Sequence, residues 1–431
     1  EDANASKAPS ARLADKIACV FVPIVMGVAL ITGVVWLFCG ATAEFALSCA
    51  ICVLVISCPC ALGLATPVAL MVGTGKGAEN GILIKSGASL EVTHSVQTVV
   101  LDKTGTITQG KPAVTRILPV GIDEDTLLRV AGALEKGSEH PLSEAILAET
   151  SARALALSQA ADFLTIPGRG VQAVVSDAIF GGAQTLCVAG NAAMLQERGI
   201  PLDACQSEAD ALAANGSTPL YFAAVAAKRV LGVIAVADTV KPNSARAIRA
   251  LQQEGIEVVM LTGDNEKTAQ AIQRLVGVDK VISGVLPADK EQEIARLQSG
   301  GRLVAMVGDG INDAPALARA DVGVAIGAGT DVAIESADIV LMKSDLMDVV
   351  TAIDLSKAVI RNIKENLFWA FFYNVCGIPL AAGVFYTALG WRLSPMFGAA
   401  AMSLSSLFVV SNALRLRLVK PRAQKRAADM P

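Results

Sequence analysis

The chain has 431 residues, of which 53% are hydrophobic, and a formal net charge of −4. So small a net charge excludes a protein that recruits its partner mainly by charge, a nucleic-acid binder above all. Most cysteines lie in or beside apolar stretches, which excludes a small secreted domain held by spaced disulfides. Long apolar stretches flank a middle of mixed sequence, and this predicts a membrane protein with a large soluble insert.

Four apolar segments are long enough to cross a bilayer, which takes about 20 residues. They cover residues 17–39, 45–72, 367–389 and 393–414, and a short connection joins each pair into a helical hairpin. Basic residues gather at one end of both hairpins, and by the positive-inside rule this end, the insert and both termini are cytosolic. These residues are Lys76, Lys85, Arg361, Lys364, Arg415, Arg417, Lys420 and Arg422.

The triplet Cys58-Pro59-Cys60 interrupts the second apolar segment. Proline breaks the helical hydrogen-bond ladder, and hydrocarbon tolerates the break only where protein or a cavity satisfies the backbone. Two thiols beside such a break suit a soft metal ion. The alternative is two small buried hydrophobic residues at a helix kink.

Strand-like and helical runs alternate in the insert, which predicts a doubly wound parallel α/β sheet. Three β-rich runs cover residues 96–101, 255–261 and 303–307, and aspartates follow each of them. Because the carboxyl ends of parallel strands meet at one edge of a sheet, we expect these aspartates to gather there. Their sequences are Asp102-Lys103-Thr104-Gly105-Thr106, Thr262-Gly263-Asp264 and Gly308-Asp309-Gly310-Ile311-Asn312-Asp313.

These residues have the chemistry of phosphoryl transfer. Asp102 is a candidate nucleophile that takes a phosphoryl group as an acyl phosphate. Asp309 and Asp313 offer the hard oxygen ligands that Mg²⁺ prefers, and Lys290 is a candidate partner for phosphoryl oxygens. An aspartate after a strand is often only a turn or cap residue, but three of them beside glycine or threonine disfavour that alternative.

The motifs DKTGT, TGD and GDGxND, in this order and spacing, resemble the phosphorylation domain of P-type ATPases, within the haloacid-dehalogenase superfamily. Together with Cys-Pro-Cys they resemble the heavy-metal (type IB) branch, over essentially the whole chain. The resemblance implies that Asp102 is phosphorylated and that Asp102, Thr104, Asp309 and Asp313 serve Mg²⁺. It also implies a catalytic set of Asp102, Lys103, Thr104, Thr262, Asp264 and Lys290.

Residues 119–235 interrupt the sheet pattern and predict an inserted α+β nucleotide-binding domain. Ser138-Glu139-His140-Pro141 resembles the SEHP motif of the family. A histidine before proline is by itself an ordinary loop residue, and a lone glycine pair is weak, but DKTGT upstream favours ATP binding. The resemblance implies ATP contacts from Glu135, His140, Gly168, Gly170 and Asn191.

The membrane segments predict a monovalent soft ion, Cu⁺ or Ag⁺, as cargo. Residues 367–389 and 393–414 contain no charged side chain, whereas Zn²⁺ or Cd²⁺ would favour a carboxylate beside the thiolates. Asn366, Pro379 and Asn412 complete a pattern that resembles copper pumps, although Ala413 departs from it. The resemblance implies a Cu⁺ site of Cys58, Cys60, Tyr373, Asn374, Met402 and Ser406, and Asp15 as an entry ligand or an interfacial charge.

The sequence contains no Thr-Gly-Glu and no GMxCxxC, so we expect the C-terminal portion of a pump, without its actuator and metal-binding domains. Related alternatives are a Zn²⁺/Cd²⁺ pump and a membrane-anchored phosphatase or regulatory protein that does not transport. We expect an integral protein of a bacterial inner membrane that contacts lipid, ATP and a cytosolic copper carrier, and no nucleic acid. The expected division is a linker (1–16), a transmembrane hairpin (17–72), the phosphorylation domain (73–118 and 236–360) around the nucleotide-binding domain (119–235), a second hairpin (361–418) and a basic tail (419–431).

Overall fold

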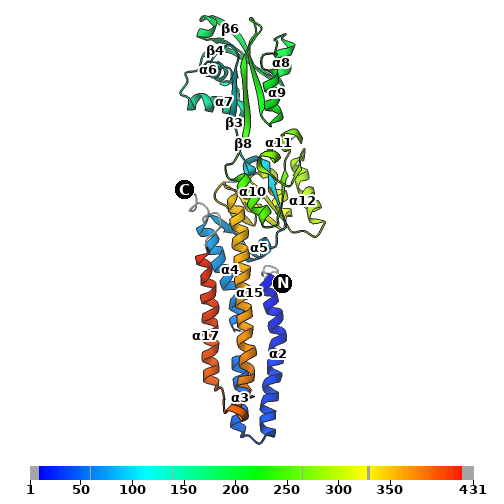
Figure 1. The fold of residues 1–431 in the computed structure, drawn as a ribbon, viewed down its shortest axis with the longest axis vertical. Helices are drawn as coiled ribbons and strands as arrows, with labels where there is room; N and C mark the ends of the chain where they lie inside the picture. Colours follow the sequence, from blue (N-terminus) through cyan, green and yellow to red (C-terminus); the bar gives the residue numbers. More distant parts are fainter. Residues whose placement is uncertain (1–8, 59, 139, 265, 328–330, 420–431) are drawn as a thin grey trace.

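The computed structural model describes residues 9–58, 60–138, 140–264, 266–327 and 331–419. Three parts are stacked along its long axis: a bundle of long helices, a middle part around a mostly parallel sheet, and an outer part around an antiparallel sheet (Figure 1). This arrangement confirms the predicted fold class of apolar helices joined to an α/β unit with an inserted second sheet.

Two hairpins form the helical bundle, and both turn at the end far from the sheets (Figure 1). Apolar side chains cover much of the outer surface of the bundle, as on helices that face lipid. Among the described helices, Cys19–Phe38 and Pro395–Leu418 are long and apolar enough to cross a membrane, and Ala43–Ile56 is apolar but shorter. The helices are α2 (Pro9–Phe38), α3 (Ala43–Ile56), α4 (Cys60–Glu79), α15 (Met347–Ala381), α16 (Tyr386–Leu389), α17 (Pro395–Leu414) and the 3-10 turn η5 (Arg415–Leu418).

Two of the four predicted spans differ from continuous helices. The segment 45–72 divides into α3 and α4 at the triplet, whose Pro59 lies outside the described residues. The prediction of one helix over 367–389 is wrong, because α15 begins in the middle part at Met347 and ends at Ala381. Gly383 then takes a left-handed φ of 78°, which stops the helix before the short α16.

The middle part contains a seven-stranded sheet in the order β1-β13-β12-β11-β2-β9-β10, parallel except where β1 pairs with β13. The central strands are apolar and buried along their length, as expected for a sheet that helices cover on both faces. The strands are β1 (Ile82–Ile84), β2 (Thr98–Asp102), β9 (Glu257–Leu261), β10 (Lys280–Ile282), β11 (Val304–Gly308), β12 (Val322–Ile326) and β13 (Ile339–Leu341).

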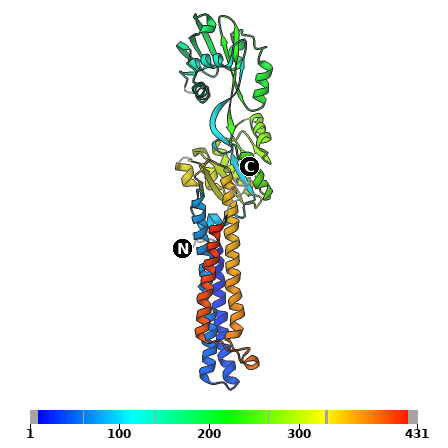
Figure 2. The same ribbon diagram turned by 60° about the vertical axis from the view of Figure 1, so that its left-hand side comes forward.

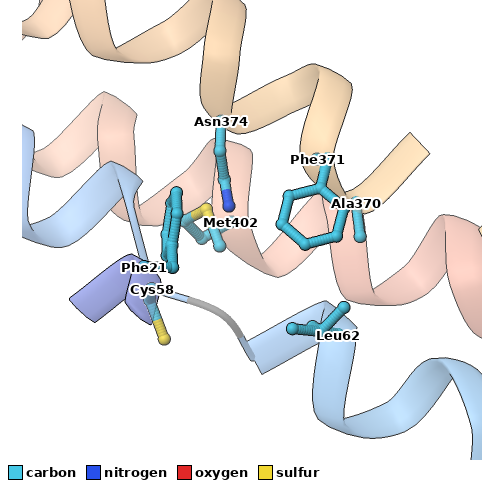
Figure 3. Close-up of a pocket in the computed structure, with 7 residues that line it drawn as sticks. All are labelled: Phe21, Cys58, Leu62, Ala370, Phe371, Asn374 and Met402. Atoms are coloured by element: carbon cyan, nitrogen blue, oxygen red, sulfur yellow. The ribbon is translucent and has the colours of Figure 1, made fainter. Parts of the chain in front are cut away.

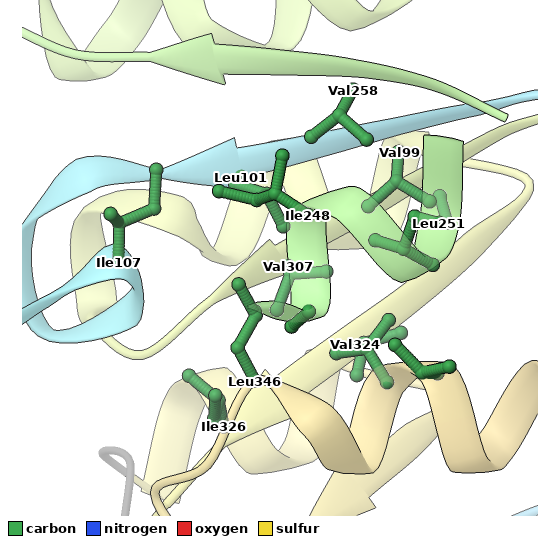
Figure 4. Packing of buried hydrophobic residues seen from close by; sticks show 14 of the residues in the cluster. Val99, Leu101, Ile107, Ile248, Leu251, Val258, Val307, Val324, Ile326 and Leu346 are labelled. Atoms are coloured by element: carbon green, nitrogen blue, oxygen red, sulfur yellow. The ribbon is translucent and has the colours of Figure 1, made fainter. Parts of the chain in front are cut away.

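Helices and turns that cover this sheet bury one apolar face against it. Ile248 and Leu251 of α10 belong to the same buried cluster as Val99 and Leu101 of β2 (Figure 4). This packing fixes the end of β2, where Asp102 lies. The elements are α5 (Gly87–Thr93), η1 (Lys103–Ile107), α10 (Ser244–Gln253), α11 (Glu266–Val276), η3 (Pro287–Asp289), α12 (Lys290–Gln298), η4 (Ile311–Asp313), α13 (Ala314–Arg319) and α14 (Asp331–Ser336).

The outer part contains a six-stranded antiparallel sheet in the order β3-β8-β7-β6-β5-β4. The strands are β3 (Thr108–Pro119), β4 (Gln159–Ile166), β5 (Gly170–Ser176), β6 (Gln184–Gly190), β7 (Thr218–Ala224) and β8 (Arg229–Val240). Its helices are α6 (Glu124–Glu135), α7 (Pro141–Ala152), η2 (Ala178–Phe180), α8 (Ala192–Glu197) and α9 (Gln206–Ala214).

The paired strands β3 and β8 run from the middle part into the outer part (Figure 2). Residues 108–118 and 236–240 therefore lie in the second sheet, outside the expected range of 119–235. The boundaries differ because this strand pair both joins the two parts and supplies one edge of the outer sheet.

Candidate active site

Three aspartates meet at the carboxyl edge of the parallel sheet. Asp102 ends β2, Asp309 follows β11, and Asp313 lies in η4. Parallel pairing of β2 with β11 sets Leu101 opposite Val307, so both strands end at the same level. A carboxylate oxygen from each aspartate lies within 4.8 Å of those of the other two. The structure thus brings together the aspartates that the sequence predicts there.

Lys290, the first residue of α12, lies between two of these carboxylates. Its Nζ is 2.5 Å from Oδ1 of Asp102 and 2.7 Å from Oδ1 of Asp313, and all three side chains are buried. Burial raises the pKa of Asp102 to about 7, the charge of Asp313 adds to this, and Lys290 opposes it. Burial and Asp313 also raise the pKa of Asp309. The ammonium groups of Lys290 and Lys241 together do not balance three carboxylates, so the cluster has capacity for a further cation.

This donor set fits Mg²⁺, which prefers carboxylate oxygens and needs few protein ligands. Asp102, Asp309 and Asp313 would hold the ion, and Asp309 is the one of the three that does not pair with Lys290. Thr104, two residues after Asp102 in the turn η1, is exposed.

Gly105 lets the turn after Asp102 approach Asp309. Its φ is 72°, and a Cβ there would lie only 1.6 Å from Oδ2 of Asp309. Gly308 has the same role toward Asp313, since its Cβ would lie 2.6 Å from Oδ2 of that residue. The glycine in DKTGT and the first glycine in GDGxND are therefore required by close packing around the carboxylates.

The loop after β9 closes one side of the site. Nζ of Lys103 is 2.7 Å from Oδ2 of Asp264, and the backbone N–H of Asp264 donates to Oγ1 of Thr262 at 3.1 Å. These contacts hold Thr262-Gly263-Asp264 against the turn that follows Asp102. The structure thus joins the first and second predicted motifs directly.

Sequence reasoning missed Asp238 and Lys241 at the end of β8. Asp238 accepts hydrogen bonds from Oγ1 of Thr108 and, at 2.9 Å, from the backbone N–H of Gly110. Nζ of Lys241 donates to the carbonyl oxygen of Gly105. The second connecting strand therefore holds the phosphorylation turn in place. The available signal was the charged pair in Asp238-Thr239-Val240-Lys241-Pro242 after an apolar strand.

A cavity of about 350 Å³ opens in the outer part between α6, α7 and the ends of β4, β5 and β6. The five residues predicted to contact ATP all line it, together with apolar side chains that suit a flat base. Its lining includes Glu135, Ser138, His140, Leu142, Ser143, Ile166, Gly168, Gly170, Val171, Gly190, Asn191 and Leu220.

Hydrogen bonds fix the polar residues of this cavity. The hydroxyl of Ser143, a residue that sequence reasoning missed, donates to Oε2 of Glu135 at 2.5 Å. Nδ1 of His140 accepts from the backbone N–H of Leu142 at 3.2 Å, which leaves the proton of the neutral ring on Nε2. Asn191 donates through Nδ2 to the carbonyl oxygen of Gly168 at 3.1 Å.

Gly170 permits the close approach of β5 and β6 beside this cavity. Its φ is 150°, and a Cβ would lie 2.1 Å from the carbonyl oxygen of Ala189.

A small cavity of about 10 Å³, room for a single ion or water, lies at the helix break in the bundle. Asn374 and Met402 point into it, while the sulfur of Cys58 turns away from them (Figure 3). The side chain of Cys60 lies outside the described residues. The lining residues are Phe21, Cys58, Leu62, Ala370, Phe371, Asn374 and Met402.

Two predicted copper ligands do not line this cavity. Tyr373 lines a neighbouring cavity with Asn366 and Asn412, since it precedes Asn374 and projects about 100° away around the helix. Ser406 is half-buried on α17 and lines neither cavity. Of the six residues expected at the copper site, Cys58, Asn374 and Met402 therefore line this cavity, and Tyr373 and Ser406 do not.

Comparisons with known proteins identify the family to which the middle part and the bundle belong. A model of the haloacid dehalogenase-like hydrolase family matches residues 96–321. The chain is 52% identical over 425 residues to the probable copper-transporting ATPase PacS of Synechococcus elongatus, covering 98% of this chain and 56% of that protein. It is 50% identical over 437 residues to the copper-exporting P-type ATPase of Staphylococcus aureus strain USA300 / TCH1516, covering 100% of this chain and 51% of that protein.

Among solved structures, a zinc-transporting PIB-type ATPase in the E2.Pi state matches with a TM-score of 0.81 and 36% identity, over 94% of this chain and 63% of that one. The chain spans about half the length of the curated relatives that it matches. It belongs to the haloacid dehalogenase-like hydrolases and, within them, to the heavy-metal P-type ATPases, as its motifs predict.

Glu135 gives a prediction for the pH dependence of stability. Burial raises its pKa above the ordinary 4.5, although Ser143 opposes the shift. The folded state therefore holds this proton more tightly than the unfolded state, and stability falls as pH rises from 4.5 through the raised pKa. We expect the melting temperature of Glu135→Gln, relative to wild type, to rise over this pH range.

Glu144→Gln in α7 is the control, because Glu144 is exposed in the same part of the molecule. Its melting temperature should follow that of wild type at every pH. Equal pH profiles for Glu135→Gln and wild type would contradict the raised pKa.

Proposed function

We propose that this chain is the catalytic and ion-binding part of an ATP-driven exporter of monovalent copper, Cu⁺ or Ag⁺, that works through an aspartyl phosphate on Asp102. The observation that carries the proposal is the buried cluster of Asp102, Asp309 and Asp313 around Lys290. Similarity to copper-transporting ATPases supports the assignment of the cargo.

Phosphoryl transfer follows from the positions of these residues. A carboxylate oxygen of Asp102 attacks the γ-phosphorus, the bond from that phosphorus to the bridging oxygen breaks, and ADP leaves with the electron pair. The ammonium of Lys290 faces the negative charge that spreads over the phosphoryl oxygens. Bound Mg²⁺ would supply further neutralisation of phosphate charge. Lys103 and the loop at Thr262 and Asp264 keep the turn after Asp102 in place.

Nucleotide binding would use the cavity in the outer part. Nε2–H of His140 is available as a donor, and the apolar side chains of Leu142 and Leu220 offer a surface for adenine. Gly168, Gly170 and Asn191 form the opposite wall, with Glu135 as the buried polar group. Because β3 and β8 join the two parts, bending of this strand pair would bring the γ-phosphate to Asp102.

The proposed cargo site is the cavity at Cys58. A thiolate, the thioether of Met402 and the amide of Asn374 suit a soft monovalent ion, once the disulfide that Cys58 forms in this structure is reduced and its sulfur turns toward the other two. Cys60 belongs to the proposal by resemblance alone, as do Tyr373 and Ser406. Zn²⁺ is the second candidate because a zinc-transporting ATPase is a structural neighbour, but no acidic side chain lines the cavity among the described residues.

The proposed setting is a membrane crossed by both hairpins, with both sheets on the cytosolic side. A bacterial inner membrane and a cytosolic copper carrier complete the proposal. A membrane-anchored phosphatase that does not transport is the alternative of another class, and metal dependence of phosphorylation separates it from a pump.

Asp102→Asn tests the reaction. We expect the protein to lose all covalent label from radiolabelled ATP, because an amide oxygen is a far weaker nucleophile than a carboxylate. The label is measured on acid-quenched protein. Asp203→Asn, which alters an exposed aspartate in the outer part, should keep the wild-type label. A persistent label in Asp102→Asn would place the phosphoryl group elsewhere.

Met402→Leu tests the cargo under reducing conditions that keep the cysteines as thiols. We expect Cu⁺ to stimulate labelling only at a concentration raised by at least about tenfold, since even groups one shell away contribute 10–100-fold to metal affinity. Cys58→Ser should act in the same direction, because a hydroxyl is a harder ligand than a thiol.

Met396→Leu is the matched control, because Met396 lies on the same helix with 74% of its surface exposed. It should respond to Cu⁺ as wild type does. Unchanged responses in Met402→Leu and Cys58→Ser, or stimulation by Zn²⁺ and not by Cu⁺ or Ag⁺, would contradict the proposed cargo.

A further inference from the structure

A cavity of about 340 Å³, unused by the proposed reaction, lies at the sheet-facing end of the bundle. It is formed by α15 on one side and by η5 with Val419 on the other, and α15 lies beside α17, the helix that leads into η5 (Figures 1 and 2). Its lining residues are Ala358, Arg361, Asn362, Glu365, Arg415, Leu416, Leu418 and Val419.

The sequence sets the level of this cavity. The apolar run of α17 ends at Leu414, and basic residues alternate with leucine in η5. On α15, Arg361 and Lys364 precede the apolar run that begins at Leu367. If both helices cross a membrane, the cavity lies where acyl chains meet phospholipid headgroups on the cytosolic side.

The charges that face the cavity are of both signs. Arg361 is exposed and has no ion pair or side-chain hydrogen bond to any residue in the described ranges. Arg415 donates one hydrogen bond, to Oδ1 of Asn412 at 2.7 Å. Glu365 is half-buried, and the Nδ2 of Asn412 lies 3.4 Å from its Oε2, a long hydrogen bond. Two guanidinium groups and one carboxylate thus have capacity for a ligand.

Buried amides fix the two walls relative to each other. Nδ2 of Asn362 donates to the carbonyl oxygen of Asn412 at 2.9 Å, and Nδ2 of Asn412 donates to Oδ1 of Asn366 at 2.9 Å. Asn362 and Asn366 are both buried. The two helices that carry the charged groups are therefore already held in place before a ligand binds, which lowers the entropic cost of binding.

The rest of the lining is apolar. Leu416 is buried, whereas Leu418 is 80% exposed and Val419 lies beside it. A free anion would gain no favourable contact with this apolar rim. The first carbons of an acyl chain would cover it and remove its apolar surface from water. The cavity therefore suits an amphipathic ligand.

We propose that this cavity binds one phospholipid with a zwitterionic amine headgroup, phosphatidylethanolamine. Its phosphate contacts Arg361 and Arg415, its ammonium contacts Glu365, and its acyl chains pass Leu418. The bound lipid ties α15 to η5 at the membrane boundary. The inference rests on the proposed membrane crossing of α15 and α17, and not on the identity of the transported ion.

Native mass spectrometry of the full chain, stripped of lipid in detergent, tests the site. We expect one phosphatidylethanolamine per chain, retained more strongly than phosphatidylglycerol, which lacks the amine. Arg361→Gln and Arg415→Gln should each lower the lipid occupancy constant by at least about tenfold, because each removes a charge-assisted hydrogen bond to the phosphate. Glu365→Gln should remove the preference for phosphatidylethanolamine over phosphatidylglycerol.

Arg417→Gln is the matched control, because it removes the same charge from the same 3-10 turn without altering the lining. Its lipid constant should fall by about fivefold at most, the general effect of one basic residue near a membrane surface, because Arg417 does not contact the bound phosphate. An equal loss in Arg417→Gln would mean general attraction to the basic surface and would overturn the site. Competition by excess inorganic phosphate would assign the cavity to a phosphate ion and also overturn the proposal.

Melting temperatures separate lost binding from lost folding. Asp102→Asn should bind lipid as wild type does, so failure of this site and failure of the proposed reaction are distinguishable. If an arginine variant fails to fold, the lipid preference of Glu365→Gln decides the question alone, and an unchanged preference would contradict the proposal.

Discussion

The ammonium of Lys290 between Asp102 and Asp313 is the interaction on which the catalytic part depends. Buried carboxylates are tolerated only where cations and hydrogen bonds compensate for lost water, and removal of one partner from a buried pair costs about 3–5 kcal/mol. The parallel pairing of β2 and β11 brings two of the aspartates together, and α12 delivers the lysine. A lysine at a helix N-terminus is unfavourable on its own, because the helix dipole places positive charge there. The two carboxylates compensate for this repulsion at Lys290.

Excess negative charge makes this cluster a site for chemistry and not only a structural ion pair. The pKa of Asp102 is raised to about 7 by burial and by Asp313, against the pull of Lys290. A magnesium ion and the arriving phosphate would change that balance at the same place. Gly105 and Gly308 allow this crowding, because any side chain there would occupy the space of Asp309 or Asp313.

The long helix α15 links the two proposed sites. It begins beside the parallel sheet at Met347, continues past the lipid cavity, and carries Asn374 to the small cavity at Cys58. Val359 and Ile363 pack in one buried cluster with residues of α4, the helix that follows the Cys-Pro-Cys break. We infer that α15 would couple phosphorylation of Asp102 to the shape of the cargo site, because it is one continuous helix that reaches both parts.

The sequence predicted those parts of the fold that local patterns determine. Strands followed by DKTGT, TGD and GDGxND are recognisable because turn glycines and carboxylates cluster within a few residues, and parallel pairing then places them together. Lys241 was missed because its partner, the carbonyl oxygen of Gly105, lies 136 residues away. Ser143 was missed for a related reason, since only the packing of α6 against α7 reveals its bond to Glu135.

The directions of the side chains in the bundle could not be predicted from the sequence either. Tyr373 and Asn374 are adjacent, so a motif that names both does not tell which one faces the Cys58 cavity. The end of α15 at Ala381 was hidden for another reason: the apolar composition continues to Leu389, whereas the helix stops near Gly383.

The most direct measurement is the rate of covalent labelling from ATP by Lys290→Met, with Lys290→Arg as the variant that keeps the charge. Loss of a positioned charge at a phosphoryl group predicts a rate lower by about 10²–10³ in Lys290→Met, with partial recovery in Lys290→Arg. For this comparison, both variants must show a melting transition of a folded protein. A labelling rate in Lys290→Met close to that of wild type would contradict the account.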